Sequence, residues 1–127
     1  MSGRVVHFEI PYDDGDRARQ FYSSAFGWQI MPMPEMGYTI VISGPSGDQG
    51  PTEAGFINGG MMQREAPFTS PNVVIDVDNL EDALKAVNDA GGTTVSDRQP
   101  VGDMGFAAYF KDTEGNLVGL WETARSE

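Results

Sequence analysis

Apolar and polar positions follow the same order in two parts of the chain. A shift of 65 residues lays 7–30 over 72–95, with apolar, acidic and glycine positions in register. Each segment opens on a short apolar run, Val5–Ile10 or Val73–Val77, that is typical of a β-strand. Apolar residues then recur three and four positions apart, as on one face of a helix, until a glycine ends the pattern. The sequence therefore predicts a strand followed by a helix, twice.

The two predicted helices share their design. Acidic residues begin each of them, with Asp13 and Asp78 placed to cap the free N–H groups of the first turn. Glycines end them, at Gly27 and at Gly91. The apolar stripes are Ala18, Phe21, Tyr22, Ala25 and Phe26 in the first helix, and Leu80, Ala83, Leu84, Val87 and Ala90 in the second.

Three more strands are predicted after each helix, which gives an α+β fold of two βαβββ modules. The first set is Trp28–Met31, Tyr38–Ser43 and Gly55–Met62, and the second is Thr93–Ser96, Phe106–Lys111 and Leu117–Glu122. The polar, glycine-rich segment 44–53 is predicted to be a loop, and 112–116 a tight hairpin turn. We expect one domain over 1–127, with modules 1–62 and 72–127 joined by the linker 63–71.

Strand alternation predicts which side chains face away from the helices. In the first strand, Val6, Phe8 and Ile10 should pack under the helix, so His7 and Glu9 take the other side. The same reasoning collects a mixed polar and aromatic set on that side: His7, Glu9, Asn72, Asp76, Gly60, Met62, Gly119 and Trp121. We expect the two glycines to leave room there, and a hollow of this composition is the usual setting of a ligand site.

Composition narrows the classes of partner. Lys plus Arg is 8 and Asp plus Glu is 19, so the net charge is 8 − 19 = −11, which disfavours nucleic acid and anionic membrane surfaces. The absence of cysteine excludes disulfides, thiolate zinc sites and a cysteine nucleophile. No apolar run is long enough to span a membrane. We therefore expect a cytoplasmic protein with a small-molecule partner.

The repeat resembles the vicinal oxygen chelate superfamily, which includes glyoxalase I, bleomycin-resistance proteins and extradiol dioxygenases. Four segments carry the resemblance: the strand 6–10, the helix and following turn at 17–28, the helix start at 77–79, and the hairpin 110–117. The resemblance implies a cup-shaped glyoxalase/bleomycin resistance-like domain, in which two modules close around a ligand. It also implies a homodimer, as in many family members.

Family members that use a metal supply ligands from strands one, four, five and eight of the repeat. Carried over position by position, those ligands correspond to His7, Gly60, Asn72 and Gly119, and only His7 keeps the usual residue type. Divalent ions need imidazole, carboxylate or thiolate donors, so we expect no cofactor. His7 remains a weak candidate metal ligand, with Glu9 as a substitute donor on the same face, and a bound divalent metal stays an open alternative.

The leading hypothesis is a protein that binds a small apolar or aromatic molecule in the cup. His7 and Asn72 would anchor the ligand, and Met62, Trp121, Gly60 and Gly119 would surround it. The first alternative is a metal-dependent lyase or isomerase of the glyoxalase type, and the second is a ligand-binding regulatory module. If the protein is an enzyme, His7 and Glu9 are the candidate catalytic residues; otherwise His7 is a hydrogen-bonded remnant of an ancestral site.

Overall fold

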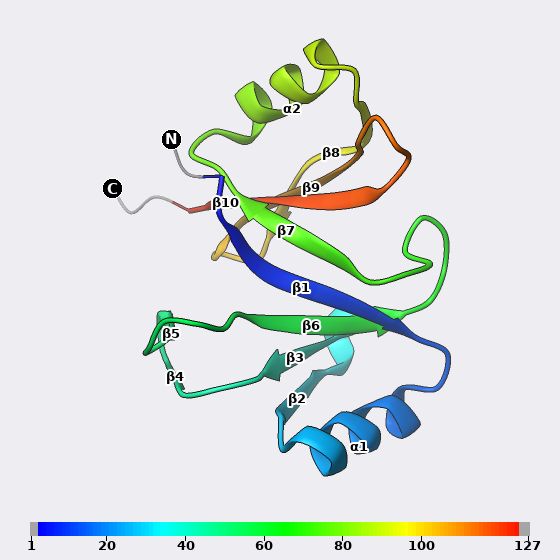
Figure 1. Cartoon of the computed structure of the whole chain (residues 1–127), viewed down its shortest axis with the longest axis vertical. Helices are drawn as coiled ribbons and strands as arrows, with labels where there is room; N and C mark the ends of the chain where they lie inside the picture. Colours follow the sequence, from blue (N-terminus) through cyan, green and yellow to red (C-terminus); the bar gives the residue numbers. More distant parts are fainter. Residues whose placement is uncertain (1–2, 125–127) are drawn as a thin grey trace. The chain divides into compact units, whose positions relative to one another are not determined.

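The computed structural model describes residues 3–124 and confirms the predicted α+β fold of two βαβββ modules (Figure 1). The described residues divide into two compact units. One unit spans residues 7–71. The other comprises residues 72–124 together with residues 3–6. The predicted cup depends on how the two units are arranged, so it stays a prediction.

The unit of residues 7–71 contains a mixed sheet with the strand order β2-β3-β6-β1. Strands β1 and β6 run parallel, and the other two pairings are antiparallel. A short 3₁₀ helix and a two-strand hairpin, β4 with β5, interrupt the connections. The elements are β1 (Val5–Tyr12), α1 (Gly15–Phe26), β2 (Gln29–Met33), η1 (Pro34–Met36), β3 (Tyr38–Ile42), β4 (Ser46–Gly47), β5 (Gly50–Pro51) and β6 (Asn58–Gln63).

The unit of residues 72–124 repeats this topology. Its strand order is β7-β10-β9-β8, with β7 and β10 parallel and the remaining pairs antiparallel. The elements are β7 (Asn72–Asp76), α2 (Leu80–Asp89), β8 (Thr93–Val101), β9 (Gly105–Lys111) and β10 (Leu117–Thr123). The predicted tight turn after β9 is present, where the Asp112 carboxylate accepts hydrogen bonds from the N–H groups of Glu114 and Asn116.

The predicted capping residues are each one position too early. Asp14 caps α1 by accepting from the N–H of Arg17, and Asn79 caps α2 by accepting from the N–H of Asp82. Both capping residues have extended backbone, as expected of the residue that precedes the first helical turn. Gly27 ends α1 with a left-handed φ of 73°, as the sequence predicts.

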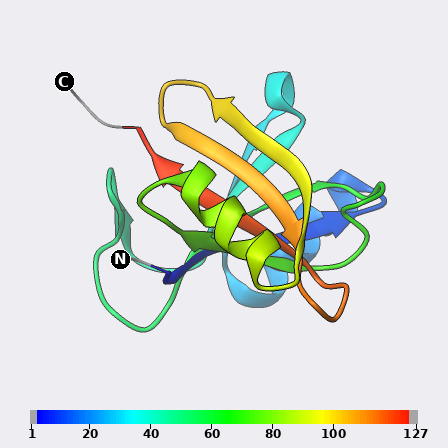
Figure 2. The ribbon, with the colours of Figure 1, turned by 90° about the horizontal axis from the view of Figure 1, so that it is seen from above.

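Helix α2 packs on one face of its sheet and forms the core of that unit (Figure 2). The buried residues of this core are Leu80, Leu84, Ala108, Phe110 and Leu120. The Glu122 carboxylate on β10 accepts from the N–H of Leu80 at 2.8 Å, so the last strand also satisfies the start of the helix.

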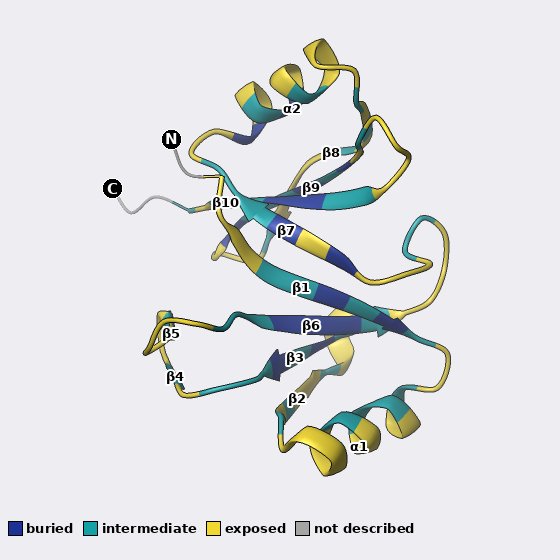
Figure 3. Cartoon of the chain, in the orientation of Figure 1, coloured by how far each residue is buried: buried dark blue, intermediate teal, exposed yellow. Residues whose placement is uncertain are grey.

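Helix α1 buries none of its residues, in contrast to α2 (Figure 3). The apolar stripe of this helix is present in the sequence, but its side chains are half-buried or exposed. Phe21 and Phe26 are 55% and 64% exposed. The rings contact one another instead: Trp28 stacks on Tyr22 with centroids 4.9 Å apart, and Phe21 lies edge-on to Tyr22 at 5.0 Å. Within residues 3–124, no helix is long and apolar enough to cross a bilayer.

The buried core of the unit of residues 72–124 leads to a prediction about stability. Leu80 is 0% exposed, so Leu80→Ala should lower the free energy of unfolding by about 2–5 kcal/mol through lost burial and a residual cavity. Met104 is 57% exposed, and Met104→Ala should change the same quantity by less than about 0.5 kcal/mol. Urea denaturation of both variants measures the difference. Equal losses would contradict the position of Leu80 in the core.

Candidate functional site

Three polar side chains meet on one face of the sheet of residues 7–71. The Nε2 atom of His7 lies 2.8 Å from the hydroxyl oxygen of Tyr38. The same hydroxyl donates a hydrogen bond to Oε2 of Glu9 at 3.0 Å. Glu9 is 4% exposed, whereas His7 and Tyr38 are half-buried. One phenol thus connects the two residues that the sequence marks as candidate catalytic groups.

Strand register explains this meeting. His7 and Glu9 are two residues apart on β1, so alternation places both on the same face. On the neighbouring strands, Glu9 pairs with Gly60 of β6, and Tyr38 of β3 pairs with Met62. The tyrosine side chain leaves β3, passes over Gly60 and reaches Glu9, a span of two strand spacings of about 4.8 Å each.

The glycine at residue 60 makes this path possible. A Cβ atom there would overlap the ring and the hydroxyl of Tyr38. The φ of Gly60 does not lie in the left-handed region, so the need for glycine is steric rather than conformational. We expected Gly60 to leave open space on this face, and that expectation is wrong because Tyr38 fills the space.

The surroundings of His7 favour the neutral imidazole. Burial lowers the pKa of His7 below its usual value of 6.5, and the nearby Glu9 carboxylate offsets part of this effect. Protonation of His7 therefore requires a lower pH than in a solvent-exposed histidine. At neutral pH the ring keeps one N–H group and one free lone pair.

Apolar side chains surround the three polar residues on the same face. Met33 and Met62 pair with Tyr38 from its two sides, in β2 and β6. Ile40 of β3 pairs with Gly60. Met62 is half-buried, so the structure places it next to Tyr38, on the face that the sequence predicts. The result is an apolar surface with a single polar cluster, which is the usual composition of a small-molecule site.

The remaining predicted ligand residues lie in the unit of residues 72–124. A Cβ atom at Gly119 would lie 3.0 Å from side-chain atoms of both Tyr109 and Val74. The expectation of empty space at Gly119 is therefore also wrong. Trp121 donates its ring N–H to the Thr123 hydroxyl at 3.1 Å.

Asn72 is 7% exposed, and neither its amide nitrogen nor its amide oxygen has a hydrogen-bond partner among residues 3–124. A buried amide without partners is destabilising in the fold as it stands.

The side chains present do not form the metal-binding set of the resembling family. In residues 3–124 no group of three or more His, Asp or Glu side chains is arranged to hold a metal ion. Two of the four positions carried over from the family are Gly60 and Gly119, which have no donor atoms. Glu122 is also not a ligand on this face, because it binds the Leu80 N–H and lies 3.5 Å from Arg98 on the helix side. The donor set does not fit a divalent ion.

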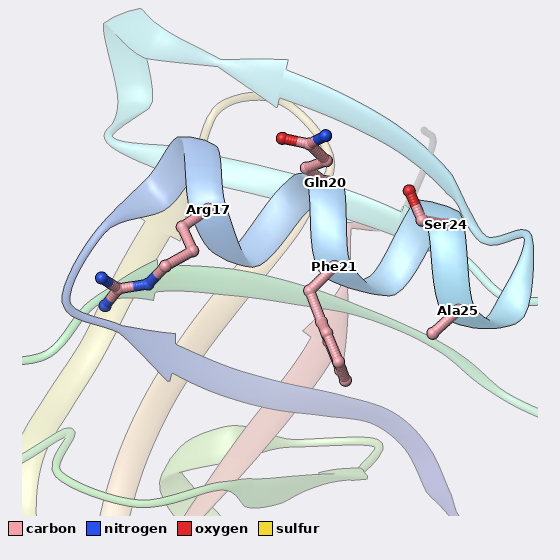
Figure 4. Close-up of a pocket in the computed structure, with 5 residues that line it drawn as sticks. All are labelled: Arg17, Gln20, Phe21, Ser24 and Ala25. Atoms are coloured by element: carbon pink, nitrogen blue, oxygen red, sulfur yellow. The ribbon is translucent and has the colours of Figure 1, made fainter.

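A second surface feature lies apart from this cluster. An open depression follows the exposed face of α1 and is lined by Arg17, Gln20, Phe21, Ser24 and Ala25 (Figure 4). None of these residues belongs to the sheet, and none contacts His7, Glu9 or Tyr38 through a hydrogen bond.

Tyr38 is the residue that sequence reasoning missed as a polar contact, because the sequence marks it only as the first residue of a predicted strand. The feature that identifies Tyr38 is its position across two strands. Tyr38 of β3 pairs with Met62 of β6, which places it diagonally opposite Gly60. That feature is recognisable only after the register of β3 and β6 is known.

The chain is similar to glyoxalase-like proteins. Residues 4–44 match the family model for the bleomycin resistance protein-like N-terminal domain. A glyoxylase-like domain-containing protein of Didymella fabae is 34% identical over 123 residues, and the match covers 94% of each chain. A putative glyoxylase of Mycobacterium tuberculosis is 29% identical over 122 residues. That match covers 92% of this chain and 44% of the relative, so the chain spans less than half of that protein.

A solved structure has the same fold. Methylmalonyl-CoA epimerase of Streptomyces coelicolor, in complex with 2-nitronate-propionyl-CoA, gives a TM-score of 0.67 at 16% sequence identity. The match covers 100% of this chain and 99% of the epimerase. At this level of identity the likeness concerns the arrangement of helices and strands.

Because Tyr38 lies over Gly60, substitutions at these two residues should have non-additive effects on the free energy of unfolding. Gly60→Ala should lower the free energy of unfolding by about 1–3 kcal/mol, because the new methyl group meets the tyrosine ring. In a Tyr38→Ala background the same substitution should be at least about 1 kcal/mol less destabilising. Gly59→Ala is the matched control, since its Cβ would meet Phe8 and not Tyr38. Additive effects of Gly60→Ala and Tyr38→Ala in urea denaturation would contradict the contact.

Proposed function

The chain belongs to the vicinal oxygen chelate superfamily, and we propose that it is a glyoxalase-like member that binds a small apolar or aromatic molecule without the metal of that family. The ligand would lie on the face of the sheet that carries His7, Glu9 and Tyr38. Met62 and Ile40 would supply its apolar contacts, and the polar cluster would orient it.

One observation carries this proposal. The phenol of Tyr38 stands over Gly60, at the position from which family members that use a metal project a carboxylate. The hydroxyl of Tyr38 is hydrogen-bonded to both His7 and Glu9, so both of these side chains already have a polar partner. Metal binding would require them to give up these bonds, and without a third charged donor the ion would regain too little to offset its dehydration.

The alternative is a metal-dependent lyase or isomerase of the glyoxalase type. The names of the relatives support it, since they include a putative glyoxylase and an epimerase. His7, at the first ligand position, also supports it. In that case His7 and Glu9 would have to move away from Tyr38 to reach the ion.

Restoring the missing donor tests the proposal. The wild-type protein should hold no stoichiometric zinc, nickel or manganese after dialysis against each ion, as measured by elemental analysis. Tyr38→Ala/Gly60→Glu combines a third donor with His7 and Glu9 and removes the obstructing ring. This variant should bind zinc about tenfold or more tightly than the wild type.

Tyr38→Ala alone is the control, because it removes the ring without adding a donor. Its zinc affinity should stay close to that of the wild type. A near-stoichiometric metal content in the wild type that is lost in His7→Ala would overturn the proposal and favour the metal-dependent enzyme. A catalytic role of His7 and Glu9, binding by Asn72 and Trp121, a cytoplasmic location and homodimer formation stay predictions from the sequence.

A further inference from the structure

We infer that the site selects ligands that donate a hydrogen bond, such as phenols and alcohols, because Tyr38 turns His7 into a hydrogen-bond acceptor. The inference rests on the proposed function, since it names the ligand class of the same site. Tyr38 acts here as a positioning residue: it touches His7 and fixes which ring nitrogen carries the proton.

The first step is the proton of the phenol. A tyrosine hydroxyl has one proton to donate, and a carboxylate has none. In the pair of Tyr38 and Glu9, the proton therefore comes from the tyrosine, and the hydroxyl donates it to Oε2 of Glu9 at 3.0 Å. The oxygen of Tyr38 is left with lone pairs only.

The second step is the tautomer of His7. Nε2 lies 2.8 Å from an oxygen that has already used its proton, so a hydrogen bond there requires Nε2 to be the donor. A neutral imidazole has a single N–H group. Nδ1 therefore carries the free lone pair, and burial, which disfavours a second proton on the ring, keeps it free.

The third step is the absence of a competing donor. Among residues 3–124, Nδ1 of His7 has no hydrogen-bond partner within its own unit. The register partner of His7 is Asn58, whose amide oxygen accepts from the Ser43 N–H and whose amide nitrogen donates to the Ser46 hydroxyl, so both of these bonds are directed away from His7. His7 is half-buried, so a ligand that reaches this face has access to the ring. A ligand with a donor group satisfies Nδ1, whereas one with only acceptor atoms leaves two lone pairs facing each other.

Two probes of similar size and shape test the selectivity. The aromatic compound p-cresol has a hydroxyl donor, and 4-methylanisole carries the same oxygen as a methyl ether without a proton. Titration followed by ligand-observed NMR should show that the wild-type protein binds p-cresol roughly tenfold or more tightly than 4-methylanisole.

Variants separate positioning from a structural role. Tyr38→Phe keeps the ring over Gly60 but removes the hydroxyl, so either ring nitrogen of His7 is free to carry the proton, and the affinity ratio should fall towards one. Glu9→Gln should also lower the ratio, since an amide at residue 9 is able to donate to Tyr38 and reverse the chain of hydrogen bonds. Tyr22→Phe is the matched control, because Tyr22 stacks on Trp28, and its ratio should equal that of the wild type. The melting temperature of each variant reports whether the fold is retained.

The outcomes distinguish the inference from the proposed function. A preference for p-cresol that is lost in Tyr38→Phe or Glu9→Gln, and kept in Tyr22→Phe, supports the inference. Equal affinity of the wild type for both probes, or a preference unchanged in both site variants, overturns the inference and leaves the proposed function standing. No binding of either probe at millimolar concentration overturns the proposed function together with the inference.

Discussion

The hydrogen bonds of the Tyr38 hydroxyl to His7 and Glu9 depend on the absence of a side chain at residue 60. Because residue 60 is glycine, the ring of Tyr38 lies flat across β6 and extends from β3 to β1. The two hydrogen bonds then join β3 to β1 through side chains, across the intervening strand β6. Because Tyr38 passes over Gly60, it determines the hydrogen bonding of the His7 ring. It also fills the space at a position that the family resemblance assigns to a metal ligand.

The repeat gives this arrangement a counterpart. Gly119 of β10 pairs with Val74, as Gly60 of β6 pairs with Glu9, and a Cβ atom at residue 119 would lie 3.0 Å from the ring of Tyr109. At both of the positions that the family resemblance assigns to a metal-binding carboxylate, the residue is a glycine, and a tyrosine of the neighbouring antiparallel strand lies beside it. This pattern is why we propose a site based on hydrogen bonds rather than on a bound ion.

The strand and helix order could be predicted from the sequence because it depends on local patterns. Apolar spacing, the glycines after each helix and the turn built on Asp112 each act within a few residues. The observed helix caps lie one residue after the predicted ones. Asp13 and Asp14 are both suitable capping residues, and only the backbone conformation decides between them. The contact of Tyr38 with Glu9 spans 29 residues and two strands, so no local pattern encodes it.

The protonation of the His7 ring is the most direct measurement of the central claim, that the Tyr38 hydroxyl accepts from His7 and donates to Glu9. His7 is the sole histidine of the chain, so its ring nitrogens give the only imidazole signals in a ¹⁵N NMR spectrum. The account predicts a neutral ring protonated on Nε2 near neutral pH, with a titration midpoint below 6.5 because burial lowers the pKa of His7. In Tyr38→Phe the fixed preference for Nε2 should weaken. A ring protonated on Nδ1, or a midpoint above 6.5, would contradict the account.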